Sequence, residues 1–203
     1  MKINKLYDDV YEIENFLSDE EFEEVLKIIK DTPEQDWYSE ESKIKHHTPD
    51  FWFGKSLHFE EDNVFDIIND KMRNLLESYS FYPGKMHLKR YTKDDFINYH
   101  ADQWIPDLDY YIGYGFCLYF NDEYSGGELH YPDLNITVKP KPNSLYIHGG
   151  HIVHGSLPVL DDRIRYFSTV FVHGTEKKPT KLKGDIFKWQ ILDLQVKTLV
   201  LIK

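Results

Sequence analysis

Two histidines and one aspartate are the residues in this chain whose types and spacing best suit a metal site. His100 and Asp102 are separated by one residue, and His154 follows further along the chain. On an extended segment, residues at i and i+2 project from the same face, so we expect His100 and Asp102 to point at a common location. Neutral imidazole and carboxylate are both ligands for divalent transition metals. With one more histidine from elsewhere in the fold, the pattern predicts a metal centre.

A histidine followed two residues later by an acid is weak evidence when it stands alone. A randomly ordered chain of this composition would contain about two such triplets, and this chain has two, the second being His58 with Glu60. Glu60 and Glu61 come just before a predicted helix, where acidic side chains interact favourably with the helix dipole. We therefore interpret the second triplet as part of a helix start.

Several histidines compete to be the third ligand: His130, His148, His151, His154 and His173. His154 is favoured because a strand-like segment carrying two arginines follows it. We expect His148 and His151, which flank Gly149 and Gly150, to make hydrogen bonds or to face solvent, with a second metal site as the alternative. Two histidines and one carboxylate on one face of an ion leave its other positions open, which is typical of non-haem Fe(II) oxygenases.

Short motifs surround these residues in a fixed order between residues 86 and 173. They are Arg90-Tyr91, His100-Ala101-Asp102, Leu118-Tyr119-Phe120-Asn121, Gly126-Gly127-Glu128-Leu129, His154 with Pro158-Val159, and Arg165-Tyr166. In this order they resemble the prolyl 4-hydroxylase branch of the Fe(II)/2-oxoglutarate-dependent dioxygenases.

The resemblance implies both a site and a reaction. The catalytic residues would be His100, Asp102, His154 and Arg165, and the first three would bind Fe(II). The co-substrate 2-oxoglutarate would chelate the iron and pair its distal carboxylate with Arg165, whose planar guanidinium matches a carboxylate bidentately. Tyr91 and Tyr119 would line the co-substrate pocket, although core packing is an equal alternative for Tyr91. The resemblance also implies O2 as the second co-substrate, ascorbate as an optional cofactor, and release of succinate and CO2 as a C-H bond is hydroxylated.

The chain departs from the family pattern in the two turns beside the site. Aspartates replace the usual glycines there, at 94 and 95 and at 161 and 162. Arg165 also comes one residue later than is usual, which makes Arg163 a rival anchor for 2-oxoglutarate. Arg165 is preferred because Tyr166 follows it, as in the family, and because strand alternation aims it inward.

The order of predicted elements favours a mainly β fold with flanking helices. Ser18 and Glu21 form a capping box that opens a helix to about Lys30, and a second helix is predicted over 63–79. A long aromatic loop is expected over 31–59. Strands are predicted over 11–16, 86–91, 114–121, 128–131, 135–139, 144–148, 165–173, 186–192 and 196–202. This order predicts a β-sandwich or jelly roll with helices packed on one side. The resemblance implies the jelly roll, a cupin-like double-stranded β-helix.

We expect one domain over 1–203. It would comprise a helical support region (1–85), a catalytic jelly-roll core (86–173) and C-terminal strands (174–203). An insert with Trp104, Tyr110 and Tyr111 is interpreted as a lid or substrate wall.

Composition limits the partners and the location. The net charge of -11 argues against a nucleic-acid partner, because such binding depends on Lys and Arg neutralising phosphates. The single Cys117 fits a reducing compartment, and no apolar run approaches the roughly 18 residues of a membrane span. We therefore expect a cytoplasmic protein with no membrane partner. The resemblance to the prolyl 4-hydroxylase branch implies a peptide or protein substrate that is hydroxylated at proline. Two alternatives stay open: the same chemistry on a free amino acid or small metabolite, and a non-catalytic metal-binding jelly-roll module.

Overall fold

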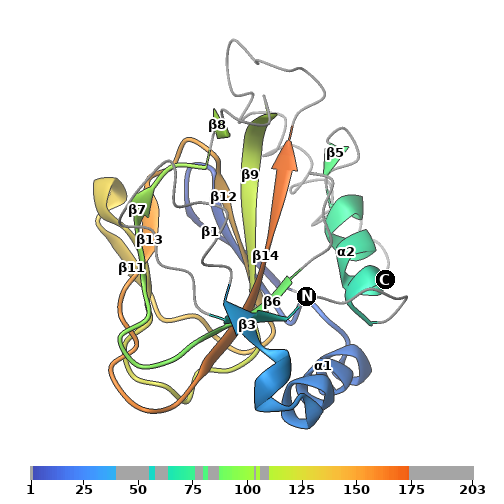
Figure 1. Ribbon diagram of the computed structural model, residues 1–203. Coiled ribbons are helices and arrows are strands. Elements are labelled where there is room, and N and C mark those ends of the chain that lie inside the picture. The colour runs from blue at the N-terminus through green and yellow to red at the C-terminus, as the bar shows by residue number, and fades with distance from the viewer. Residues whose placement is uncertain are drawn as a thin grey trace.

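Two antiparallel sheets form the centre of the molecule in the computed structural model (Figure 1). The structure describes residues 2–39, 55–57, 64–75, 80–81, 87–102, 104–105 and 110–173. The C-terminal strands predicted within 174–203 lie outside the described residues, as does the His58 triplet.

Within these ranges, ten strands form the larger sheet and four form the smaller one. The larger sheet runs in the order β1 (Lys2–Tyr7), β2 (Val10–Glu14), β12 (Ser144–Gly149), β9 (Tyr110–Tyr119), β14 (Arg165–His173), β6 (His87–Tyr91), β4 (Lys55–Leu57) and β3 (Tyr38–Ser39), with β5 (Ser80–Phe81) beside β14 and β8 (Trp104–Ile105) beside β9. The smaller sheet runs β11 (Ile136–Val138), β10 (Leu129–Tyr131), β13 (His154–Ser156) and β7 (Ile97–His100). Neighbouring strands such as β2 and β12 are far apart in the chain, as in a jelly roll. The predicted fold class is confirmed.

Strand alternation along β9 separates two hydrophobic cores. Phe116 and Leu118 face the helices and join one buried cluster, which includes Val25 of α1 (Asp19–Asp31) and Ile68 of α2 (Val64–Asn74). Tyr119 faces the other way and joins a second cluster, which also contains residues of the smaller sheet. Both helices thus cover the outer face of the larger sheet, and the space between the sheets is left for the site (Figure 1).

The first helix begins where the sequence predicts. The Ser18 hydroxyl accepts a hydrogen bond from the Glu21 backbone N-H, and the Ser18 N-H donates to the Glu21 carboxylate at 2.8 Å, which completes the predicted capping box. The second helix ends at Asn74, earlier than predicted, and residues 76–79 lie outside the described part of the chain. Neither of these two helices has the length and apolar character needed to cross a bilayer.

In the described part of the N-terminal region, several short strands accompany the two predicted helices. Instead of only one short strand over 11–16, β1 and β2 form a hairpin that extends the larger sheet. The described parts of 31–59 form a short 3-10 turn and the edge strands β3 and β4 rather than only a loop. β2 and β4 also pair with β12 and β6, which are more distant in sequence, and such pairing leaves little periodic signal in a short segment. The predicted strand 165–173 matches β14.

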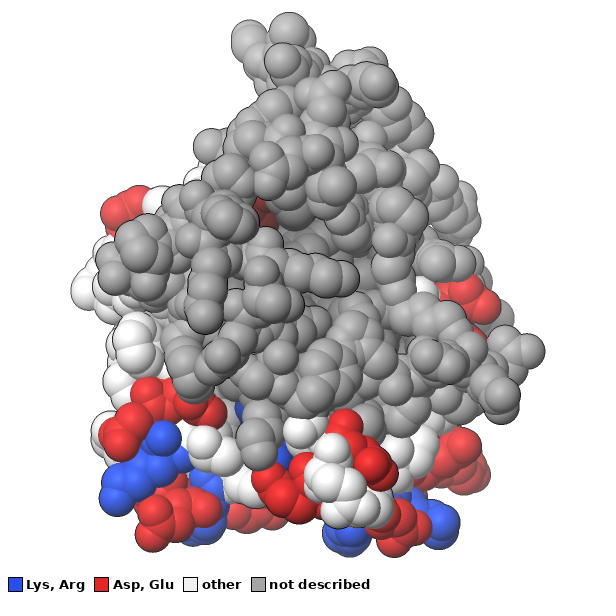
Figure 2. All heavy atoms as spheres, viewed as in Figure 1, with Lys and Arg blue, Asp and Glu red and all other residues white. Residues whose placement is uncertain are grey.

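Charged side chains of both signs lie interspersed along the lower edge of the molecule as viewed in Figure 2, where α1 lies. Lys27 and Asp31 on α1, for example, form an ion pair of 2.9 Å. Such exposed pairs contribute little to stability.

Candidate metal centre

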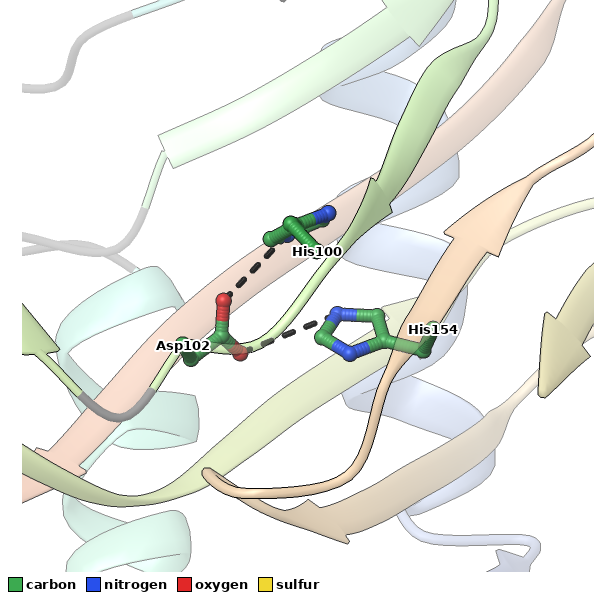
Figure 3. Close-up of side chains that lie close together, drawn as sticks. All are labelled: His100, Asp102 and His154. Carbon is green, nitrogen blue, oxygen red and sulfur yellow. Dashed lines mark ion pairs between the residues drawn. The ribbon is translucent and has the colours of Figure 1, made fainter. Parts of the chain in front are cut away.

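His100, Asp102 and His154 converge between the two sheets (Figure 3). His100 ends β7, Asp102 follows two residues later, and His154 begins β13 directly opposite His100 in the strand register. The Asp102 carboxylate lies 3.3 Å from His100 Nε2 and 3.7 Å from His154 Nε2. One ligand atom from each residue lies within 4.8 Å of the other two, so the three can share one ion.

Backbone carbonyl groups orient both imidazoles. His100 Nδ1 donates to the Asn98 carbonyl oxygen at 2.7 Å, and His154 Nδ1 donates to that of Ile152 at 3.0 Å. A carbonyl oxygen only accepts, so the proton of each neutral ring belongs on Nδ1 and the Nε2 lone pair faces Asp102. Histidine ligands of metal sites are commonly held in this way by a second hydrogen bond.

Electrostatics also favour a bound cation. Burial raises the pKa of Asp102, but the three surrounding histidines outweigh burial and lower the pKa below its usual value, so the carboxylate is ionised. Burial, together with the neighbouring His148, lowers the pKa of His154 to about 3, which keeps this imidazole neutral. Burial also opposes the charge of His100, but the adjacent Asp102 carboxylate stabilises the protonated ring and leaves the pKa of His100 raised. A buried carboxylate with two imidazoles is a donor set that fits a divalent transition metal.

His148 and Gly115 complete the surroundings of Asp102. His148 is 1% exposed, its Nε2 lies 3.3 Å from Asp102 Oδ2, and its ring centroid lies 3.8 Å from that of His154. Gly115 faces His148 across the β9–β12 pairing, and a Cβ there would lie 2.5 Å from His148 Nε2 and 2.7 Å from Asp102 Oδ2. Sequence reasoning missed Gly115, although a glycine inside a strand signals close approach by another group.

The other histidine candidates lie elsewhere. His130 Nδ1 makes a 2.6 Å hydrogen bond with the half-exposed Tyr99, and His151 is exposed. The side chain of His173 is outside the described set. His100, Asp102 and His154 form the one group of three metal-ligating side chains found among the described residues. The alternative of a second metal at His148 and His151 therefore gains no support.

Arg165 lies between the sheets as a buried cation. Its side chain is 1% exposed, and it donates from Nη1 to the Ser156 hydroxyl at 2.8 Å and from Nη2 to the Tyr119 hydroxyl at 3.0 Å. Its Nε has no hydrogen-bond partner, and no carboxylate pairs with the guanidinium among the described residues. A buried charge without a counter-charge is costly, so the arrangement suits an anionic ligand.

Arg163 occupies a different environment. Its guanidinium is exposed and pairs with Asp161, whose pKa it lowers through their hydrogen bond. Of Arg163 and Arg165, the two candidate anchors for 2-oxoglutarate, Arg165 is therefore the one buried inside the fold.

The two predicted tyrosines surround Arg165. The guanidinium carbon lies 5.2 Å from the Tyr91 ring centroid and 5.0 Å from that of Tyr119. Burial raises the pKa of Tyr119, so its phenol stays protonated and can donate to a ligand. Tyr124, which was not singled out from the sequence, is buried nearby, and its hydroxyl has no hydrogen-bond partner. These groups form a polar lining around the cation.

Strand geometry relates the metal-ligating residues to Arg165. His154 and Ser156 are at i and i+2 in β13, so their side chains share a face and their Cα atoms are about 7 Å apart. Because Ser156 contacts the guanidinium, Arg165 lies on the side of β13 to which His154 also points.

The predicted insert forms an extension of β9. Trp104 pairs with Tyr111 and Ile105 with Tyr110, so β8 and the start of β9 make a short hairpin. The side chains of Trp104, Tyr110 and Tyr111 are outside the described set. Their role as a lid or substrate wall stays a prediction.

The sequence matches no protein-family model and no curated protein, but solved prolyl hydroxylases share the fold. A viral collagen prolyl hydroxylase from Paramecium Bursaria Chlorella virus-1, solved as a 2OG (2-oxoglutarate) complex, aligns with a TM-score of 0.61 and 20% identity over 82% of this chain and 97% of that one. A Pseudomonas putida prolyl-4-hydroxylase aligns with a TM-score of 0.61 and 14% identity over 83% and 94%. A prolyl hydroxylase in complex with a hypoxia inducible factor peptide fragment from Trichoplax adhaerens aligns with a TM-score of 0.67 and 19% identity over 84% and 86%.

Proposed function

We propose that this protein is an Fe(II)- and 2-oxoglutarate-dependent oxygenase that hydroxylates a C-H bond of a peptidyl substrate, with proline as the preferred residue. The observation that carries the proposal is the combination of three converging ligands with a buried arginine that lacks a carboxylate partner among the described residues. Neither half would be sufficient alone, since a metal site or a buried arginine can be purely structural.

Each site residue has a role in this proposal. His100, Asp102 and His154 would hold Fe(II), which together with 2-oxoglutarate would activate O2 for hydroxylation with release of succinate and CO2. Arg165 would bind the distal carboxylate of 2-oxoglutarate, assisted by the Tyr119 hydroxyl. The guanidinium is desolvated before the ligand arrives, so the charge pair would form in a low dielectric where it is strong.

The surrounding core would shield the reacting groups. Tyr91, Phe167 and Tyr119 are buried around Arg165, and Phe167 lies with its ring centroid 4.4 Å from the guanidinium carbon. Excluding water in this way favours productive oxidation of the substrate over side reactions. Cys117 lies in the same interior, where burial and the Asp102 charge raise its pKa to about 12. Its thiol would therefore stay protonated and take no part as a nucleophile.

The peptidyl substrate is supported by the solved neighbours. One of them is described as bound to a peptide fragment and another as a collagen prolyl hydroxylase. Ascorbate as an accessory and a cytoplasmic location stay predictions.

Turnover of labelled 2-oxoglutarate is the direct experiment. The protein is incubated with Fe(II), O2 and 1-labelled 2-oxoglutarate, with and without proline-containing peptides, and labelled CO2 and succinate are measured. We expect release by the wild-type protein and none by His154→Ala. His130→Ala is the matched control, because His130 lies on the same small sheet but away from the ligands, and it should retain turnover. Absence of release from the wild-type protein under every condition would contradict the proposal.

The substrate panel separates the alternatives. A gain of one oxygen atom in a proline peptide, detected by mass spectrometry, supports peptidyl hydroxylation. The same gain only in a free amino acid or metabolite would support the hydroxylation reaction but contradict a peptide substrate. A metal held by four protein ligands without exchangeable water would instead indicate a structural, non-catalytic site.

A further inference from the structure

His148 is the buried polar group nearest to the metal-ligating residues that the proposed function leaves without a role. It lies on β12 and contacts two of the metal-ligating residues: the ring packs against His154, and Nε2 contacts Asp102. It does not belong to the group of three ligand atoms that can share an ion. Its position therefore calls for a role other than coordination.

The hydrogen-bond direction follows from the chemistry of the partners. An ionised carboxylate only accepts, so His148 Nε2 must carry the proton that bonds Asp102 Oδ2. In a neutral ring Nδ1 is then an acceptor, and the Tyr131 hydroxyl lies 3.4 Å from it. Tyr131 is fully buried, which raises its pKa well above its ordinary value and keeps the phenolic proton available to donate. The result is a directed chain from Tyr131 through His148 to Asp102.

We propose that His148 is a positioning residue that occupies Asp102 Oδ2 by hydrogen bonding and so presents Oδ1 alone to the metal. This inference rests on the proposed function, because it assumes that the three residues hold a metal. With Oδ2 occupied, the carboxylate binds through one oxygen and leaves one more coordination position for exchangeable ligands. The packing of the His148 ring on His154 holds a second ligand at the same time.

The main chain is shaped for this contact. Gly115 lies directly opposite His148 in the strand register, and any Cβ at that position would occupy the space where His148 Nε2 and Asp102 Oδ2 meet. The β9 backbone therefore leaves room for the pair, and the glycine is explained by the same contact.

Co(II) binding tests the inference without turnover. His148→Gln retains an N-H donor at the same number of bonds from Cβ, whereas His148→Leu retains bulk and removes the donor. We expect His148→Leu to raise the Co(II) dissociation constant by about 10–100-fold and to change the visible ligand-field spectrum. His148→Gln should stay within about threefold of the wild type, with an unaltered spectrum. Circular dichroism confirms that each variant is folded.

The outcomes separate this inference from the proposed function. If His148→Leu binds Co(II) like the wild type with the same spectrum, the positioning role is wrong while the metal centre stands. If His148→Gln loses as much affinity as His148→Leu, the imidazole is needed as a ligand and the positioning role is likewise wrong. A wild-type protein that binds no Co(II) overturns the proposed function and the inference together.

Discussion

Replacing Gly115 by alanine should damage the metal centre although residue 115 offers no ligand. The added Cβ would lie 2.7 Å from Asp102 Oδ2, whereas ordinary contacts begin at 3.4 Å. The carboxylate would have to move by about 0.7 Å, several times the roughly 0.2 Å that metal-ligand distances tolerate. Disturbing the support of a metal ligand typically costs about 10–100-fold in affinity, or roughly 1.4–2.7 kcal/mol.

Gly149→Ala is the matched control for this experiment. Gly149 lies on the adjacent strand β12, and its Cβ would meet the exposed His151 ring at 2.8 Å. That ring can rotate away, so the control carries the same backbone change without moving Asp102. In isothermal titration, the Co(II) affinity of Gly115→Ala should be weakened by about 10–100-fold, whereas that of Gly149→Ala should stay within about threefold of the wild type. Equal and undiminished affinities in both variants would refute the reasoning.

The remaining predictions concern the co-substrate, the metal and the core. Arg165→Met should weaken 2-oxoglutarate binding to the metal-loaded protein by roughly 30-fold or more, corresponding to about 2 kcal/mol or more for a buried charge pair. Arg163→Met should leave 2-oxoglutarate affinity nearly unchanged. A binding titration in which Arg163→Met loses affinity and Arg165→Met does not would show that Arg163 binds the distal carboxylate. Metal at about 100 times its dissociation constant should stabilise the fold by about 2.7 kcal/mol and raise the Tm by roughly 5–10 °C. A chelator should reverse this rise in Tm. An equal rise in Tm for His154→Ala would show that the metal binds at a different site. Asn143→Ala removes two buried hydrogen bonds to the Leu17 backbone. It should lower the free energy of unfolding, measured by chemical denaturation, by roughly 2–5 kcal/mol. A decrease below about 0.5 kcal/mol would show that water replaces the amide.

Elements with a strong local signal were predictable from the sequence. The capping box at Ser18 and Glu21 marks the start of α1, and the alternating segment from Arg165 marks β14. The hairpin of β1 with β2 was only partly predicted: β2 also pairs with β12, more than a hundred residues away, whereas β1 is an edge strand that pairs with β2 and was not predicted. Long-range backbone pairing of this kind leaves no periodic signature in a short segment.

The site shows the same division. The i, i+2 spacing of His100 and Asp102 predicted a common direction, and the structure brings both side chains to His154. The choice between Arg163 and Arg165 required the start of the strand to be placed, because β14 begins at Arg165, which is buried, whereas Arg163 precedes the strand and pairs with Asp161 at the surface. The contact between His148 and Asp102 depends on the register of β12 with β9, which no local pattern encodes.

A crystal structure with Mn(II) and 2-oxoglutarate tests the central claim most directly. The account predicts one Mn(II) ion bonded to His100 Nε2, His154 Nε2 and a single oxygen of Asp102, with the distal carboxylate of 2-oxoglutarate on Arg165. Mn(II) bound elsewhere, or 2-oxoglutarate paired with Arg163 at the surface, would contradict it.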